Sequence, residues 1–189
     1  MRPRLVIMLK APVAGRVKTR LGRDTGMTAA AWWFRHQSAA VIRRVQSPRW
    51  DTWLAVAPDT ALHSRFWPAR LPRMAQGQGD LGARMARALR SSQGPVVLIG
   101  GDIPGVQQRH IAEAFQQLGP HKMVFGPATD GGFWLVGKRQ ALPRKIFEQV
   151  RWSSPFALQD SLKTVSGTVA MVQRLADVDC LADLKANGH

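Results

Sequence analysis

The chain has 189 residues, 45% of them hydrophobic, and this length allows one domain with a substantial core. No run of about eighteen apolar residues is present and the apolar stretch near the start is too short for a normal secretory signal, so we expect no membrane insertion and a cytoplasmic location. The lone Cys180 excludes an internal disulfide, and the five histidines lack the spacing of a metalloprotease or a zinc finger.

The net charge of +15 comes from 27 basic and 12 acidic residues and favours phosphorylated or polyanionic partners. Arginine outnumbers lysine, tyrosine is absent and alanine is abundant, so a GC-rich coding sequence explains the same excess without functional selection. The basic residues are spread along the chain without the interleaved aromatic pattern of single-strand binders. This distribution disfavours a nucleic-acid partner.

The first half of the chain predicts strands that alternate with helices. Leu5–Leu9 and Pro95–Gly100 are continuous apolar runs of strand length, typical of strands buried on both faces of a parallel sheet. Met27–Val45 predicts a helix with one apolar stripe, Thr52–Ala57 a further strand, and Asp80–Arg90 a helix after a glycine-rich turn.

The second half continues the alternation. A helix is expected over Gln107–Leu118 and strands over Lys122–Phe125 and Phe133–Val136, while Ser154-Pro155 predicts the cap and first position of another helix. The final block DVDCLADL predicts an acidic turn and a closing helix. No repeat or linker divides the chain, so we expect a single domain over residues 1–189, of the α/β class, with a mostly parallel, doubly wound sheet.

The loop KAPVAGRVKTRL, which follows the first strand, concentrates positive charge. Its cations are Lys10, Arg16, Lys18 and Arg20. Gly15 permits close backbone approach, and long cationic side chains suit phosphate oxygens. The spacing is not that of a P-loop. A solvated basic loop in front of a helix explains the charge equally well.

Asp102, in the block IGGDIPG, directly follows a buried strand and two glycines. A carboxylate at such a strand end is well placed to hold a divalent ion that bridges to substrate phosphates. Capping the helix expected near Gln107 is its alternative role, but the two positions are too far apart in sequence to favour it. We therefore prefer the metal.

Asp130, in the block TDGGF, lies in a tight turn whose glycines let a ligand approach the main chain. A plain hairpin turn explains this block equally well. Together with the cationic loop and Asp102, however, it would complete the charges that a metal-bound diphosphate requires at one edge of a sheet.

Five blocks in this order and spacing carry a resemblance to a known family: KAPVAGRVKTRL, QGQGDLGARM, IGGDIPG, GPATDGGFWLVG and DVDCLADL. The chain resembles small bacterial glycosyltransferase-like proteins, one branch of which is associated with arsenosugar biosynthesis. The resemblance implies the GT-A fold of nucleotide-diphospho-sugar transferases, a three-layer, Rossmann-like sandwich. The KTRL block is also similar to the equivalent loop of 2-phospho-L-lactate guanylyltransferase, and the layout is similar to that of molybdenum-cofactor guanylyltransferase.

The resemblance also implies residue roles. It implies Mg²⁺ or Mn²⁺ on Asp102, and Asp179 as a second metal ligand or a helix cap. The implied nucleotide site is the loop from Lys10 to Arg20, with Lys10, Gly15, Arg16 and Lys18, and the resemblance also implies acceptor or metal contacts near Asp130. Asp80 is expected to begin a helix, with a ribose or base contact in the nucleotide site as its alternative role. In the mechanism that follows, Lys18 and Arg20 would stabilise the leaving group, and Asp130 would be the general base or a turn residue. The chain departs from the family's usual serine, cysteine and tyrosine at Gly101, Ile103 and Phe133.

These features predict a metal-dependent transferase that uses a nucleotide or nucleotide-sugar donor. We favour glycosyl transfer to a small acceptor, with nucleotidyl transfer and release of pyrophosphate as the alternative. A non-catalytic module that binds nucleotides or nucleic acid is a third alternative. Trp134 is expected to line an acceptor pocket. Four tryptophans outside the blocks, Trp32, Trp33, Trp50 and Trp67, are expected in the core or at an interface, which leaves a homodimer open.

Overall fold

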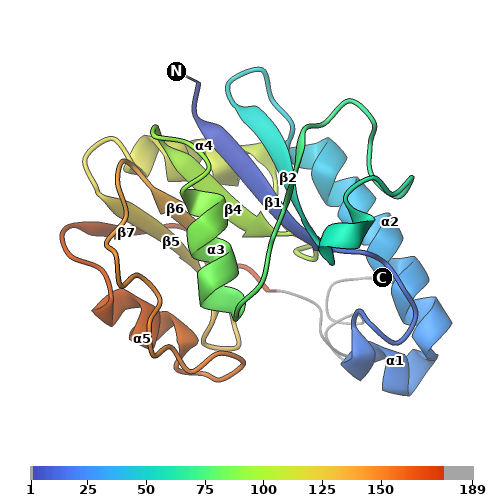
Figure 1. Ribbon diagram of the computed structural model, residues 1–189. Helices are drawn as coiled ribbons and strands as arrows, with labels where there is room; N and C mark the ends of the chain where they lie inside the picture. Colours follow the sequence, from blue (N-terminus) through green and yellow to red (C-terminus); the bar gives the residue numbers. More distant parts are fainter. Residues whose placement is uncertain (1, 177–189) are drawn as a thin grey trace.

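The computed structural model describes residues 2–176, which are built around one seven-stranded sheet in the order β3-β2-β1-β4-β6-β5-β7 (Figure 1). The strands are β1 (Arg4–Lys10), β2 (Asp51–Ala57), β3 (Arg73–Ala75), β4 (Val96–Gly100), β5 (Met123–Pro127), β6 (Phe133–Lys138) and β7 (Val169–Met171). Neighbouring strands are parallel except at β6, which is antiparallel to both β4 and β5. The predicted α/β class with a mostly parallel sheet is confirmed.

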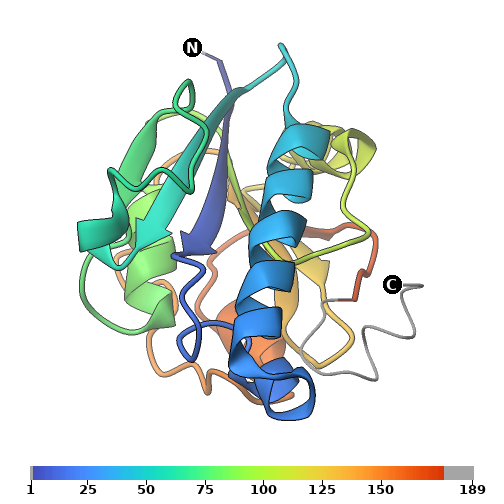
Figure 2. The ribbon, with the colours of Figure 1, turned by 90° about the vertical axis from the view of Figure 1, so that its right-hand side faces the viewer.

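Helices cover both faces of the sheet (Figures 1 and 2). They are α1 (Thr19–Thr25), α2 (Met27–Val45), α3 (Leu81–Leu89), α4 (Gln108–Gln117), α5 (Ala157–Lys163) and the short 3₁₀ helix η1 (Asp59–Ala61). Within residues 2–176, none of the helices has both the length and the apolar character needed to cross a bilayer.

The alternation of β1 side chains divides the core into two layers. Leu5, Ile7 and Leu9 pack in one cluster with apolar residues of α2 and α4. Val6 packs in the other cluster with Met85 of α3 and further residues of α3 and α5. Successive side chains of a strand point to opposite faces, so a strand buried on both faces must be apolar throughout. This explains the continuous apolar run from which the strand was predicted.

Most predicted elements are confirmed to within a few residues, and the predicted helix at Met27–Val45 has the same bounds as α2. The prediction of a helix beginning at Ser154-Pro155 is wrong, because α5 begins at Ala157. Ser154 Oγ donates to the Arg151 carbonyl at 2.6 Å and accepts from the Phe156 N–H at 3.3 Å, which makes a turn rather than a cap. The block DVDCLADL lies outside the described residues.

The strand order reverses beside β1. The chain first extends the sheet from β1 through β2 to β3, and then returns so that β4 pairs with the other side of β1. Lys10 ends β1 and Gly100 ends β4, so both loops leave from the same edge of the sheet. In open α/β sheets, ligands bind in the crevice at such a reversal, beyond the carboxyl ends of the strands.

Candidate functional site

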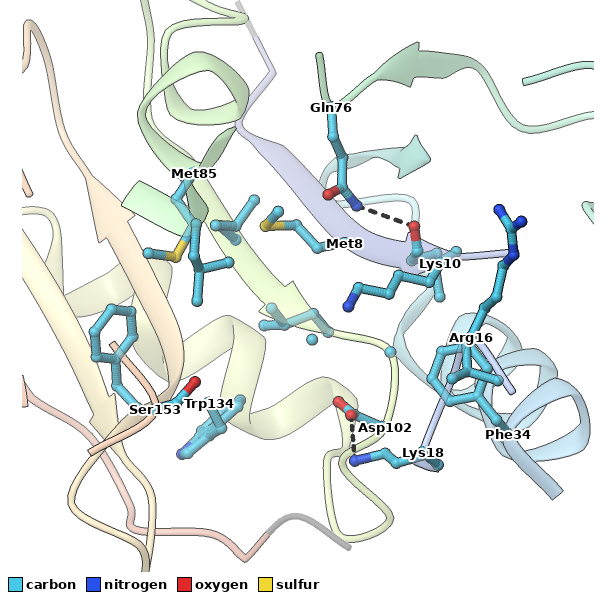
Figure 3. Close-up of a pocket in the computed structure, with 18 of the residues that line it drawn as sticks. Met8, Lys10, Arg16, Lys18, Phe34, Gln76, Met85, Asp102, Trp134 and Ser153 are labelled. Atoms are coloured by element: carbon cyan, nitrogen blue, oxygen red, sulfur yellow. Dashed lines mark hydrogen bonds and ion pairs between the residues drawn. The ribbon is translucent and has the colours of Figure 1, made fainter. Parts of the chain in front are cut away.

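A cavity of about 490 Å³ opens at the carboxyl ends of β1 and β4 (Figure 3). Apolar side chains of the sheet, among them Met8, Leu98 and Val136, form one part of its lining. The other part is cationic and comes from the segment that runs from the end of β1 through the loop into α1, which contributes Lys10, Arg16, Lys18 and Arg20. The reversal point of the sheet therefore carries a pocket with a strongly basic wall.

The loop after β1 is held at both ends. The Ala11 N–H donates to the Ala57 carbonyl at 2.7 Å, which keeps the chain beside β2 just beyond Lys10. Gly15 then turns the chain with a φ of 76°, a conformation that favours glycine. Val17 is buried against Phe34 of α2 and fixes the far end of the loop. Gly15 itself does not line the cavity, but its turn brings the cations on either side of it to the wall.

Asp102 faces this basic loop across the cavity. Its Oδ2 lies 2.7 Å from Lys18 Nζ, and the side chains of Lys18 and Asp102 are 7% and 27% exposed. The capping role is excluded, because Gln107 caps α4 in a reciprocal arrangement with His110. Asp102 therefore lies at the cavity as a carboxylate that already contacts a cation.

The glycine in the place of the family's serine belongs to the packing under this carboxylate. A Cβ atom on Gly101 would lie 2.2 Å from Leu9 Cδ2, so a larger residue requires the Leu9 side chain to move. Phe133, in place of the family's tyrosine, packs edge-on against Phe125 with 5.2 Å between ring centroids. Both departures are thus accommodated by local packing, and neither removes the Asp102 carboxylate.

Among the predicted site residues that the structure describes, Gly15, Asp80 and Asp130 do not line the cavity. Asp80 caps α3, where its side chain accepts from the Ala83 N–H at 2.8 Å. Asp130 lies in the turn between β5 and β6, and its Oδ1 accepts from the Gly132 N–H at 2.9 Å. Asp179 lies outside the described residues. The structure brings together Lys10, Arg16, Lys18, Arg20 and Asp102, and leaves Gly15, Asp80 and Asp130 off the cavity wall.

Gln76 is a cavity residue that the sequence reasoning missed. Its side-chain amide donates to the carbonyls of Leu9 at 3.0 Å and Ala55 at 2.9 Å, and its side chain is directed toward the end of β1 (Figure 3). These bonds use both amide hydrogens, so the Oε1 atom is left as an acceptor at the cavity. A glutamine placed between a short strand and the glycines of QGQG was the available signal.

A strained segment closes another side of the cavity. Phe147, Gln149 and Ser153 have φ values of 65°, 58° and 57°, which non-glycine residues rarely adopt, and Ser153 lines the cavity. Such strain accumulates at functional sites. Local sequence gives no signal for it, and part of the segment is held by a distant residue, since the Phe147 N–H donates to Thr164 Oγ1 at 3.1 Å.

The predicted tryptophan roles divide between the cavity and the rest of the molecule. Trp134 lines the cavity and its indole N–H donates to the Gln173 carbonyl at 3.0 Å. Trp50 and Trp67 are buried in the core, whereas Trp32 on α2 is 63% exposed.

A second cavity of about 650 Å³ adjoins the first and shares Lys10 and Arg16 with it. Arg84 and the hydroxyl residues Thr60 and Ser64 also line it. Lys10 and Arg16 therefore stand between two spaces, which gives an extended ligand room on both sides of the cations.

Asp102 supplies one carboxylate ligand for a divalent ion. The carboxylate is partly exposed to the cavity and already binds a cation, the Lys18 ammonium. In the part of the chain that the structure describes, no three His, Cys, Asp or Glu residues gather into a metal-binding group. An ion at Asp102 would therefore complete its coordination with phosphate oxygens and water, as Mg²⁺ commonly does.

Solved structures with this fold include transferases. A structure from Desulfovibrio desulfuricans G20, described provisionally as a nucleotide-diphospho-sugar transferase, matches with a TM-score of 0.90 and 27% identity over 98% of this chain and 86% of that chain. The CTP complex of CMP:2-keto-3-deoxy-manno-octonic acid synthetase matches with a TM-score of 0.58 and 12% identity, over 98% and 96% of the two chains. The manganese complex of Rv0371c from Mycobacterium tuberculosis H37Rv matches with a TM-score of 0.55 and 16% identity, over 99% and 98%.

The predicted nucleotide-diphospho-sugar transferase fold is confirmed by the first of these structures, and the other two share the fold alone. No curated protein is similar enough to the sequence to be matched. A family model described as "Uncharacterized protein conserved in bacteria (DUF2064)" matches residues 40–154. The chain therefore belongs to the DUF2064 family of bacterial proteins.

Proposed function

We propose that this protein is a metal-dependent transferase that uses a nucleotide donor, and that it transfers a sugar from a nucleotide-diphospho-sugar to a small acceptor. The observation that carries the proposal is the convergence of four cations and Asp102 in one cavity at the strand-order reversal. The sequence identity of 27% to the Desulfovibrio protein supports the sugar donor.

The basic wall is suited to a diphosphate. Arg16 and Arg20 can donate several hydrogen bonds each to phosphate oxygens, and lysine supplies point charges. In this proposal, the nucleoside lies toward Gln76, whose Oε1 accepts from a donor group on the base. A sugar joined to the diphosphate would then lie on the other side of the cavity, toward Trp134, which follows the Asp130 turn in the sequence.

A divalent ion bound by Asp102 would supply a Lewis acid for the phosphate oxygens. We retain Asp179, outside the described residues, as the proposed second ligand. The chain's own contribution is electrostatic: Lys18 and Arg20 stabilise the negative charge that develops on the leaving diphosphate. Removal of one such group typically lowers turnover by about 10²–10³-fold.

During transfer, an acceptor oxygen would form a bond to the anomeric carbon. The bond from that carbon to the diphosphate oxygen would break, and its electron pair would leave with the nucleoside diphosphate. Asp130 remains the proposed base that takes the acceptor proton. Its Oδ1 is used by Gly132, so Oδ2 would accept the proton from an acceptor that enters beside the turn.

Nucleotidyl transfer is the second candidate, and the room around the cations favours it. Lys10 and Arg16 border both cavities, which leaves space for a third phosphate group beyond a diphosphate. In that reaction, a nucleophile attacks the α-phosphorus and pyrophosphate leaves.

The association with arsenosugar biosynthesis, the cytoplasmic location and a homodimer stay predictions from the sequence.

Product analysis separates the two candidates. Each nucleotide sugar and nucleoside triphosphate is incubated with Mg²⁺, with water and a mixture of simple polyols as acceptors, and the phosphorus products are identified by ³¹P NMR. We expect a nucleotide sugar to yield a nucleoside diphosphate. Release of pyrophosphate from a triphosphate would establish the second candidate instead. If no donor is consumed or bound, the transferase proposal is wrong.

A further inference from the structure

The Lys18–Asp102 contact carries an inference that deepens the proposed function and rests on it. We infer that Lys18 occupies, in the nucleotide-free protein, the place at Asp102 that a divalent ion takes in the loaded protein. Lys18 and the metal would then compete for one carboxylate. The polyphosphate of the donor would relieve this competition by drawing the Lys18 ammonium to itself.

The two cations would approach the same carboxylate. Lys18 Nζ contacts its Oδ2 at 2.7 Å, and the Asp102 side chain is 27% exposed. A metal ion bound through Oδ2 would lie beside the ammonium, and the repulsion between them would displace one of the two.

The backbone of Lys18 is fixed, whereas its side chain is long enough to change partners. Lys18 has φ 45° and ψ 47°, a left-handed conformation that is unfavourable for a residue with a Cβ atom. Its carbonyl accepts from the Gly22 N–H at 2.8 Å at the start of α1, and the preceding Val17 is buried. Rotation of the four-carbon stem alone can therefore move the ammonium from Asp102 to a phosphate in the same cavity.

The remaining charges of the wall make the exchange depend on the donor. Lys10, Arg16 and Arg20 line the same cavity, and their positive charges disfavour the binding of a divalent cation there while no anion is present. A bound polyphosphate reverses this balance. Metal and nucleotide would thus raise each other's affinity by the same factor, as linkage requires.

A permanent structural ion pair is the competing interpretation, and Mn²⁺ titration distinguishes the two. Free Mn²⁺ is quantified by electron paramagnetic resonance in the nucleotide-free wild type and in Lys18→Met, Lys10→Met and Asp102→Asn. Lys10→Met removes the same charge from the same cavity and measures the general electrostatic effect. We expect Lys18→Met to bind Mn²⁺ about tenfold more tightly than Lys10→Met does, within the usual range of coupling between ligands.

Two results would overturn the inference: Mn²⁺ affinity in Lys18→Met that is no higher than in Lys10→Met, or Mn²⁺ binding that Asp102→Asn leaves unchanged. Lys18→Gly serves as a second variant, since glycine accepts the left-handed backbone, and melting curves show that each variant is folded. The same tightening is expected in Lys18→Gly.

Binding of four nucleoside diphosphates, measured in parallel by calorimetry, separates this inference from the proposed function. If none of them binds but both Lys18 variants bind Mn²⁺ more tightly, the competition is supported and the transferase proposal fails. If nucleoside diphosphates bind with Mg²⁺ while the Lys18 variants have the same Mn²⁺ affinity as Lys10→Met, the transferase proposal survives and the competition is overturned.

Discussion

Asp102 and Asp160 both contact a lysine ammonium, but their surroundings differ. Asp160 accepts from Arg151 Nε at 2.7 Å and Nη2 at 3.0 Å, and Lys163 Nζ lies 3.3 Å away. Asp102 has its contact with Lys18 at 2.7 Å, beside a cavity whose other charged lining residues, among those that the structure describes, are cations. The Asp160 carboxylate holds the segment before α5 in place, and the Asp102 carboxylate is accessible to a ligand.

The difference shows which features distinguish a binding site from a structural ion pair. The Arg151 guanidinium holds the pKa of the Asp160 carboxyl well below its usual range, so this cluster is satisfied within the protein. Around Asp102, the described lining brings four cations to one cavity, and the backbone of Lys18 is left-handed. Strain and space at a basic wall are the features on which the proposed anionic donor rests.

The largest expected effect separates the two carboxylates directly. Asp102→Asn should lower metal-dependent turnover by about 10²-fold or more, because it removes the proposed metal ligand, while the melting temperature changes little. Asp160→Asn should leave turnover nearly unchanged and lower the melting temperature. Activity assays and melting curves on both variants check this, and equal behaviour of the two would remove the distinction drawn between them.

A smaller effect is expected for the cations of the wall. Arg16→Ala should weaken nucleotide binding by about tenfold, which is the loss of roughly one charge-assisted hydrogen bond. Arg43→Ala, on the exposed side of α2, is the matched control and should bind as the wild type does. Calorimetric titration measures both affinities. Equal weakening in the two variants would mean that net charge, rather than the cavity, controls binding.

The base preference should respond to Gln76. Gln76→Leu removes the acceptor at the cavity, so the difference in affinity between the preferred nucleotide and the others should shrink, by about tenfold or less. Because the carbonyls of Leu9 and Ala55 also lose a donor, a lower melting temperature is expected as well. An unchanged ranking of nucleotides in a folded variant would contradict the proposed base contact.

The smallest effect is the pH dependence of the structural cluster. The pKa of Asp160 is lowered in the folded protein, so its contribution to stability is complete above about pH 4, where the unfolded side chain is also ionised. It is lost as the pH falls below that value toward the depressed folded pKa. The melting-temperature difference between wild type and Asp160→Asn should therefore shrink below pH 4, and a constant difference would show that ionisation does not matter.

The sequence predicted the features that depend on local pattern. The helix Met27–Val45 follows from its apolar stripe, and the position of Asp102 follows from the buried strand before it. The three-residue strands β3 and β7 are too short to show a period and were missed.

Contacts between distant segments were not predictable from the sequence. The bond from Gln76 to the Leu9 carbonyl joins positions 67 residues apart, and Lys18 meets Asp102 only because β1 and β4 are neighbours. The positive φ of Ser153 likewise has no signal in its residue type, because serine does not favour that conformation. Sequence pattern therefore indicates which segments reach the site, and the sheet topology decides which side chains meet there.

A thermal-shift panel tests the central claim that the cavity binds a nucleotide together with a divalent ion. Nucleoside triphosphates and nucleotide sugars are each added to the wild type with Mg²⁺ and with a chelator, since a ligand that binds the native state raises the melting temperature. We predict that at least one nucleotide raises the melting temperature with Mg²⁺ and that the chelator and Asp102→Asn abolish the shift. No shift with any donor, or the same shift with and without Mg²⁺, would contradict the claim.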